Sequence, residues 1–143
     1  MNALPMGVRV RVVSSLVEGV SLRGTGRMTD VGREAVTALL LRMGDGCERL
    51  HDARMRDLRC DVLELDEAWS FVFKKQGHLA EDDPAEYGDA YTWIAIDADT
   101  KLVPCFRVDK RSTAAAHAFA AELRARVVGK PQITSDGFKA YLG

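Results

Sequence analysis

The spacing of apolar residues predicts helices at the start of the chain. Between Leu4 and Val17 the later apolar positions recur at the i, i+3, i+4 spacing of an amphipathic helix. Glu18-Gly19 would end that helix, because glycine is common just after a helix C-terminus. Ser21 can then cap a second, short helix over residues 22–28.

A third helix is predicted after a tight turn at residues 29–32. It runs over residues 33–43, and its apolar face consists of Val36, Leu39, Leu40 and Met43. Gly44-Asp45-Gly46 would break or loosen it. Residues 47–59 are rich in charge, which is typical of a solvated connecting helix.

The pattern changes to that of strands after residue 61. The chain alternates over residues 62–72, with Val62, Glu64, Asp66, Ala68 and Ser70 on one face. After a polar acidic loop at 77–88, the predicted elements are strands at 91–97 and 102–108 around a hairpin turn at 98–101, a helix at 114–126 capped by Ser112-Thr113, and a strand at 131–136. The alternating aromatic residues Trp69, Phe71, Tyr91 and Trp93 are expected in the core.

The helices over residues 21–43 have the form of a helix-turn-helix. Such a motif lays its second helix across the major groove of DNA. We expect Arg33, Glu34 and Thr37 at base edges, and Arg23 and Arg27 near phosphates. The alternative is a helical hairpin with no role in DNA binding, and Gly24 and Gly26 weaken the helix prediction.

Two aspartates form the candidate catalytic and metal site. Asp66 lies within an apolar strand, where a carboxylate is costly unless it is paired or bound to metal. Asp136 ends the fourth strand. The order strand, strand, strand, helix, strand is that of an RNase H-like fold, whose first and fourth strands are adjacent. The two carboxylates would then meet and could bind divalent metal, or they are ordinary strand-end acids.

Other chemistry-bearing residues have simpler explanations. Asp97 and Asp99 lie at a hairpin, where aspartate is favoured for forming turns. Glu64 shares a face with Asp66 and is a second, weaker candidate. His117 is expected to be a structural helix residue. Lys74-Lys75 could contact DNA phosphates or be a solvated pair.

Charge and composition set broad limits. The formal net charge is −1, with residues 1–60 at +3 and residues 61–143 at −4. The three cysteines are widely spaced without a CxxC pair, which argues against a zinc finger. No apolar run is long enough to span a membrane, and the first residues do not resemble a signal peptide, so we expect a cytoplasmic protein.

Several stretches resemble bacterial insertion-sequence transposases of the insertion-sequence-one type. These are the stretch LDEAWSFV at 65–72 with KKQ at 74–76, GDAYTWIAIDADTKL at 88–102, AHAF at 116–119 and QITSDGFKAY at 132–141. The resemblance covers nearly the whole chain, and the order and spacing of its first and last motifs are specific. It implies a DDE-type enzyme that cleaves and transfers DNA strands by two-metal phosphoryl transfer.

The resemblance also implies roles for residues and partners. Asp66 matches the first and Asp136 the second acid of the DDE triad, with Mg²⁺ or Mn²⁺ as cofactor. The third acid, a glutamate on a later helix, has no counterpart in these 143 residues. The expected partners are the double-stranded DNA of element terminal repeats and targets and, for the full-length protein, further copies of itself.

The predicted fold is therefore α/β, with an N-terminal helix-turn-helix and an incomplete RNase H-like domain of mixed sheet and helices. We expect a helix-turn-helix region at 1–46, a connecting helix at 47–60 and the N-terminal part of the catalytic domain at 61–143. This chain alone is expected to have little or no transposase activity. The alternative is a non-catalytic DNA-binding protein, either an inhibitor of a full-length relative or a remnant.

Overall fold

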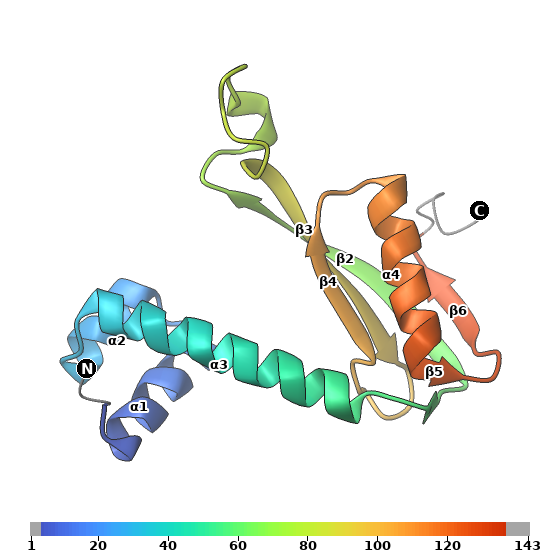
Figure 1. The fold of residues 1–143 in the computed structure, drawn as a ribbon, viewed down its shortest axis with the longest axis horizontal. Helices are drawn as coiled ribbons and strands as arrows, with labels where there is room; N and C mark the ends of the chain where they lie inside the picture. Colours follow the sequence, from blue (N-terminus) through green and yellow to red (C-terminus); the bar gives the residue numbers. More distant parts are fainter. Residues whose placement is uncertain (1–3, 137–143) are drawn as a thin grey trace. The chain divides into compact units, whose positions relative to one another are not determined.

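The computed structural model describes residues 4–136 of the chain. The chain divides into two compact units, Met1–Arg54 and Met55–Gly143. The described part of the first unit is helical, and that of the second is a mixed α/β structure (Figure 1). The last part of the fourth resemblance motif, Gly137–Tyr141, lies outside the described residues.

The first helix ends in the way that its sequence predicts. Helix α1 spans Met6–Val17, and Gly19 follows it in the left-handed region with φ of 79°. The Gly19 N–H donates to Leu16 O and the Val20 N–H donates to Ser15 O, both at 3.0 Å. This paired arrangement satisfies carbonyls that the helix end would otherwise leave unbonded, and glycine adopts the required φ without steric cost.

The next two helices and their turn form the predicted helix-turn-helix. Helix α2 spans Leu22–Thr29, and the Ser21 hydroxyl accepts a hydrogen bond from the Gly24 N–H at 3.1 Å. Asp30 takes a left-handed conformation with φ of 56°, which turns the chain into α3, Arg33–Arg54. A small core of Val12, Val31, Val36 and Leu39 holds the three helices together.

The predicted end of the third helix at residue 43 is wrong. Helix α3 continues through Gly44-Asp45-Gly46 to Arg54. Each glycine costs about 1 kcal/mol relative to alanine in a helix interior, but a helix already nucleated gains a hydrogen bond for each residue added. The charged segment after residue 47 is therefore the end of α3 and not a separate helix.

The segment that follows α3 is extended. Asp57 has a positive φ of 53°, and Leu58–Arg59 form strand β1. This strand pairs in parallel with β5, Val127–Val128. The connecting helix predicted after residue 47 is therefore wrong beyond Arg54, where α3 ends.

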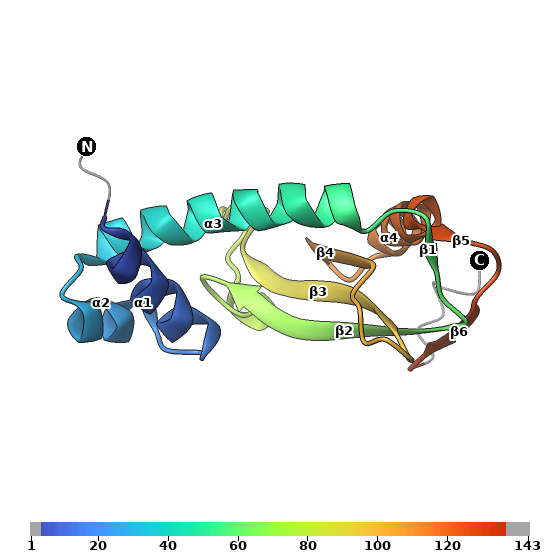
Figure 2. The same cartoon turned by 90° about the horizontal axis from the view of Figure 1, so that it is seen from below.

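The main sheet has the strand order β4-β3-β2-β6. Strands β2 (Val62–Val72), β3 (Gly88–Asp97) and β4 (Cys105–Asp109) form an antiparallel meander. Helix α4, Thr113–Arg126, then leads to β6, Gln132–Ser135, which lies parallel to β2 (Figure 2). This is the order predicted for the first part of an RNase H-like domain.

Helix α4 covers one face of this sheet. Ser112 caps it by accepting from the Ala115 N–H at 3.1 Å. The buried residues between helix and sheet are Leu63, Leu65, Trp93, Ala95, Cys105, Ala115, Ala116, Phe119, Leu123 and Val127. Because side chains alternate along a strand, Glu64 and Asp66 share the face of β2 opposite the buried Leu63 and Leu65, as predicted. That face is exposed, so the cost of a buried carboxylate that the sequence suggested for Asp66 does not apply.

Two of the aromatic residues expected in the core are exposed. Trp93 is fully buried, but Trp69 and Phe71 are 49% and 46% exposed. Both residues belong to the last part of β2, and the β2–β3 hairpin extends past α4 (Figure 1). A short 3-10 helix, η1 (Gln76–His78), follows at the tip of this hairpin.

No helix within residues 4–136 is long and apolar enough to cross a membrane.

Candidate nucleic-acid interface and carboxylate site

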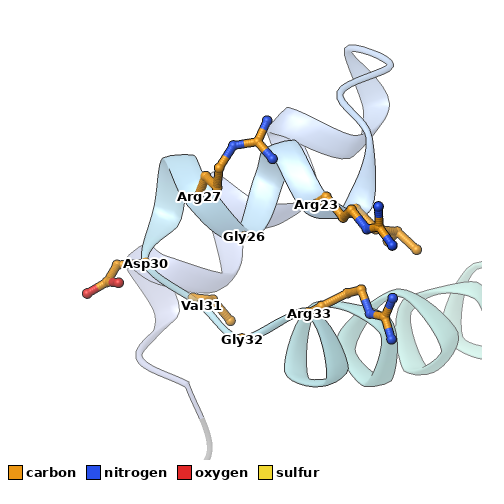
Figure 3. Close-up of a pocket in the computed structure, with 8 residues that line it drawn as sticks. Arg23, Gly26, Arg27, Asp30, Val31, Gly32 and Arg33 are labelled. Atoms are coloured by element: carbon orange, nitrogen blue, oxygen red, sulfur yellow. The ribbon is translucent and has the colours of Figure 1, made fainter.

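A basic crevice of about 460 Å³ separates α2 from the start of α3. Arg23 and Arg27 line it from α2, and Arg33 lines it from the first turn of α3. Figure 3 shows Arg23 and Arg33 projecting in the same direction from facing walls, whereas Arg27 points away from the α3 wall. The Asp30 carboxylate also points away from the crevice (Figure 3). The three arginines predicted to contact DNA thus lie around one hollow.

None of these three guanidinium groups forms an ion pair or a hydrogen bond with another described side chain or backbone group. All three residues are exposed. The positive charges of Arg23 and Arg33, on facing walls of the crevice, repel one another unless an anion lies between them. The electrostatics of the crevice therefore suit an anionic ligand.

The other predicted DNA contacts line an adjoining hollow. Glu34 and Thr37 lie there with Leu22, Ala38 and Leu41, and Arg33 belongs to both hollows. The Thr37 hydroxyl donates to the Arg33 carbonyl at 3.0 Å, one turn earlier in α3. Its oxygen keeps acceptor capacity, so Thr37 can receive a hydrogen bond from a ligand more readily than donate one.

The sheet brings the two predicted catalytic aspartates to neighbouring strands. Leu65 of β2 is the register partner of Ser135 of β6, and Asp66 and Asp136 each follow by one residue. Both aspartates are exposed. One carboxylate oxygen of Asp66 accepts the Glu67 N–H at 2.8 Å.

Arg111 lies beside the second aspartate. Its Nη2 atom is 4.0 Å from Asp136 Oδ2 and donates to Glu67 Oε2 at 3.1 Å. The side chain of Glu67 is only 2% exposed. The sequence reasoning assigned no role to Glu67 or Arg111, although Glu67 occupies an inward position of β2, where a carboxylate needs a cation.

Among the competing candidates, Asp97 has the structural role at the hairpin that the sequence predicted. Asp97 is buried, and its carboxylate accepts hydrogen bonds from the Thr100 hydroxyl and N–H. The Thr100 side-chain hydrogen bond outweighs the effect of burial and holds the pKa of Asp97 below its ordinary value. Asp99, Glu64 and His117 are exposed.

The lysine pair is engaged at the tip of the β2–β3 hairpin. Lys74 Nζ lies 2.7 Å from both carboxylate oxygens of Asp83, and this hydrogen bond lowers the pKa of Asp83. Lys75 lies over the Trp69 ring, 5.5 Å from its centroid. Lys74 is therefore less available to DNA phosphates than the sequence suggested.

A divalent cation is compatible with the donors at Asp66 and Asp136. Two carboxylates form an all-oxygen set, which Mg²⁺ and Mn²⁺ prefer. Residues 4–136 contain no group of three or more His, Cys, Asp or Glu side chains placed to hold a metal. Water or a substrate oxygen would have to complete the coordination.

Comparisons with known proteins give distant structural likeness only. No family model and no curated protein sequence matches the chain. Among solved structures it is similar to a Mos1 strand transfer complex (TM-score 0.38) and a pre-cleavage Mos1 transpososome (TM-score 0.36), each 14% identical and covering 100% of this chain. A Mos1 transposase paired-end complex has a TM-score of 0.29 at 14% identity and covers 87%.

The chain spans about half the length of the chains in those structures, 55%, 56% and 49% respectively. These TM-scores are too low to establish a shared fold. The fold assignment therefore rests on the strand order and register of the sheet, and the functional assignment rests on the residues of the two sites.

Proposed function

We propose that this chain is the front part of a DDE-type transposase of the insertion-sequence-one type. It combines a DNA-binding helix-turn-helix with part of an RNase H-like catalytic domain. The observation that carries the proposal is the parallel pairing of β2 with β6, which puts Asp66 and Asp136 at neighbouring strand positions. The resemblance of the motifs at 65–72 and 132–141 to those transposases supports the same assignment.

The proposed chemistry is cleavage and transfer of DNA strands at the ends of a mobile element. Asp66 and Asp136 would hold Mg²⁺ or Mn²⁺, which stabilises the charge that develops on phosphoryl oxygens when a phosphodiester is attacked. The role of the two carboxylates would be to bind and orient the metal ion. Double-stranded DNA of the element ends is the proposed substrate, and the full-length protein is proposed to act as a homo-oligomer.

Binding of Mn²⁺ to the full chain tests the catalytic half of the proposal. Asp66→Asn and Asp136→Asn should each weaken Mn²⁺ binding, measured by electron paramagnetic resonance of the free ion, by at least about tenfold. Asp99→Asn is the matched control, because Asp99 is an exposed acid on the turn after β3. Equal binding by all four proteins would exclude a metal site at Asp66 and Asp136.

The second candidate function is non-catalytic DNA binding. It is favoured by the exposed arginines Arg23, Arg27 and Arg33 around the basic crevice, since their attraction to DNA phosphates needs no metal site. A protein of this kind would bind duplex DNA through the helix-turn-helix, and Asp66→Asn would not change that binding. If the chain binds duplex DNA and Asp66→Asn and Asp136→Asn do not change Mn²⁺ binding, non-catalytic DNA binding is favoured over the transposase function.

A further inference from the structure

The basic crevice has the chemistry of a site for a single phosphate group. Two guanidinium groups, those of Arg23 and Arg33, project in parallel from opposite walls (Figure 3). Guanidinium is planar and presents paired N–H donors, a geometry that matches the oxygens of a phosphate. A phosphate between the two walls would relieve the repulsion between the two cations.

The start of α3 also borders the crevice, because Gly32 and Arg33 line it. The Val36 N–H donates to Gly32 O at 3.0 Å, so Gly32 is the residue that caps α3. Glycine has no side chain with which to accept the first N–H groups of the helix, whereas Ser21 does this for α2. The backbone N–H groups at the start of α3 therefore reinforce the arginines in attracting an anion.

Arg33 differs from the other predicted base readers in its position. It lines the basic crevice as well as the adjoining hollow, whereas Glu34 and Thr37 line the second hollow alone. An arginine that pairs with a phosphate fixes the orientation of the protein on DNA but does not read its sequence. The two hollows thus share Arg33, but they keep Arg23 apart from Glu34 and Thr37.

We propose that the crevice seats one backbone phosphate of duplex DNA between Arg23 and Arg33, and that Arg33 positions α3 instead of reading a base. Sequence reading then belongs to the α3 surface around Glu34 and Thr37. This inference rests on the proposed DNA binding. It changes the role of Arg33 from the one that the sequence predicted.

The test compares binding of the full chain to two DNA probes over a range of salt concentrations. One probe is a random-sequence duplex, and the other is a duplex selected from a random pool by repeated binding to the wild-type protein. Arg33→Ala and Arg23→Ala should each weaken binding to both probes by the same factor, roughly tenfold. The ratio of the two affinities should stay unchanged, and the negative slope of log affinity against log salt should decrease in magnitude by about 1.

Arg42→Ala is the control, because Arg42 is an exposed arginine of α3 that lines neither hollow. It should change affinity and slope less than either crevice variant. Arg33→Lys keeps the charge without the planar fork, so it should retain the salt slope and lose part of the affinity.

The possible failures are distinguishable. If Arg33→Ala lowers the ratio of the two affinities, Arg33 reads a base, and the inference is overturned while the proposed DNA binding stands. If Arg42→Ala and Arg33→Ala act alike, the crevice is not a specific site. If the wild-type chain does not bind the random-sequence duplex and selects no duplex from the pool, the proposed DNA binding fails and this inference fails with it.

Discussion

Arg111 donates a hydrogen bond to the carboxylate of Glu67 across the sheet–helix boundary, with Nη2 3.1 Å from Oε2. Glu67 is in the middle of β2, and Arg111 lies just before α4. The carboxylate is 2% exposed and the guanidinium side chain 36% exposed. The same guanidinium lies 4.0 Å from Asp136, so one arginine connects a buried acid to a predicted metal ligand.

Arg111→Ala is expected to lower the free energy of unfolding by about 1–3 kcal/mol, because it removes a cation from a nearly buried carboxylate. The measurement is urea denaturation, in which the midpoint should fall without a change in the slope m. Arg107→Ala is a closely matched control. The Arg107 side chain is 37% exposed, but its partner Asp109 is 34% exposed.

An exposed pair contributes little, so Arg107→Ala should cost less than about 1 kcal/mol. The contrast between the two variants then reports the burial of the carboxylate, since the arginines are alike in exposure. Equal destabilisation by both substitutions would show that the Glu67–Arg111 pair contributes no more to the free energy of unfolding than the exposed Arg107–Asp109 pair.

The sequence predicted the elements whose signals are local. Ser21 and Ser112 cap their helices, and Gly19 ends α1, because each acts through hydrogen bonds or φ values within a few residues. The alternation in β2 correctly placed Glu64 and Asp66 on one face, but it did not show that this face is exposed. The strand order followed from the sequence of element types, which permits few topologies.

The features that the sequence missed depend on contacts far along the chain. Trp69 and Phe71 are exposed although their alternation predicted a place in the core, because alternation does not encode how far α4 reaches along the hairpin. The Glu67–Arg111 pair joins residues 44 positions apart. The continuity of α3 through its two glycines reflects cooperative helix extension, which outweighs a local breaking signal.

Gly26→Ala and Gly44→Ala should have opposite effects on stability. A Cβ at Gly26 would lie 2.8 Å from the Val31 carbonyl oxygen, which belongs to the turn that closes the helix-turn-helix. Overpacking of this kind costs about 1–3 kcal/mol. A Cβ at Gly44 meets nothing within 4 Å, so alanine there should stabilise α3 by up to about 1 kcal/mol.

Thermal unfolding followed by circular dichroism measures both glycine variants. The midpoint should fall for Gly26→Ala and rise or stay unchanged for Gly44→Ala. A clear loss of stability in Gly44→Ala would contradict a continuous α3, because it would indicate that residue 44 has a backbone conformation that only glycine tolerates.

Thr100→Val should make the free energy of unfolding of the second unit depend less on pH in the acidic range. The Thr100 hydroxyl lowers the pKa of Asp97 from its ordinary 3.8, so the ionised carboxylate stabilises the fold. A lowered pKa gives stability that is present above the unfolded value and lost as pH falls through the folded value. Wild type should therefore exceed Thr100→Val in stability at neutral pH.

That difference between wild type and Thr100→Val should shrink as the pH falls below 3.8. Urea denaturation midpoints at a series of pH values measure it. A difference that stays constant from neutral to strongly acidic pH would mean that the substitution acts through packing and not through the ionisation of Asp97.

Alkylation of the three cysteines should follow their exposure and thiol acidity. Cys47 is exposed on α3, Cys60 is half-buried and Cys105 is fully buried. Burial raises the pKa of Cys60, and it raises that of Cys105 to about 11. Because the thiolate is the reactive form, iodoacetamide at mildly alkaline pH should modify Cys47 first and Cys105 last.

Mass spectrometry of peptides from timed samples measures the three rates. Cys105 should react only as fast as the second unit unfolds, so adding urea should bring its rate up to that of Cys47.

The variant Arg126→Gln provides an internal check, because Arg126 is buried beside Glu122, 2.7 Å from its carboxylate, and bonds to the Met55 carbonyl. Loosening this contact should speed the labelling of Cys105 more than that of Cys47. Rapid labelling of Cys105 in the folded wild-type protein would be incompatible with the closed packing of β4 against α4.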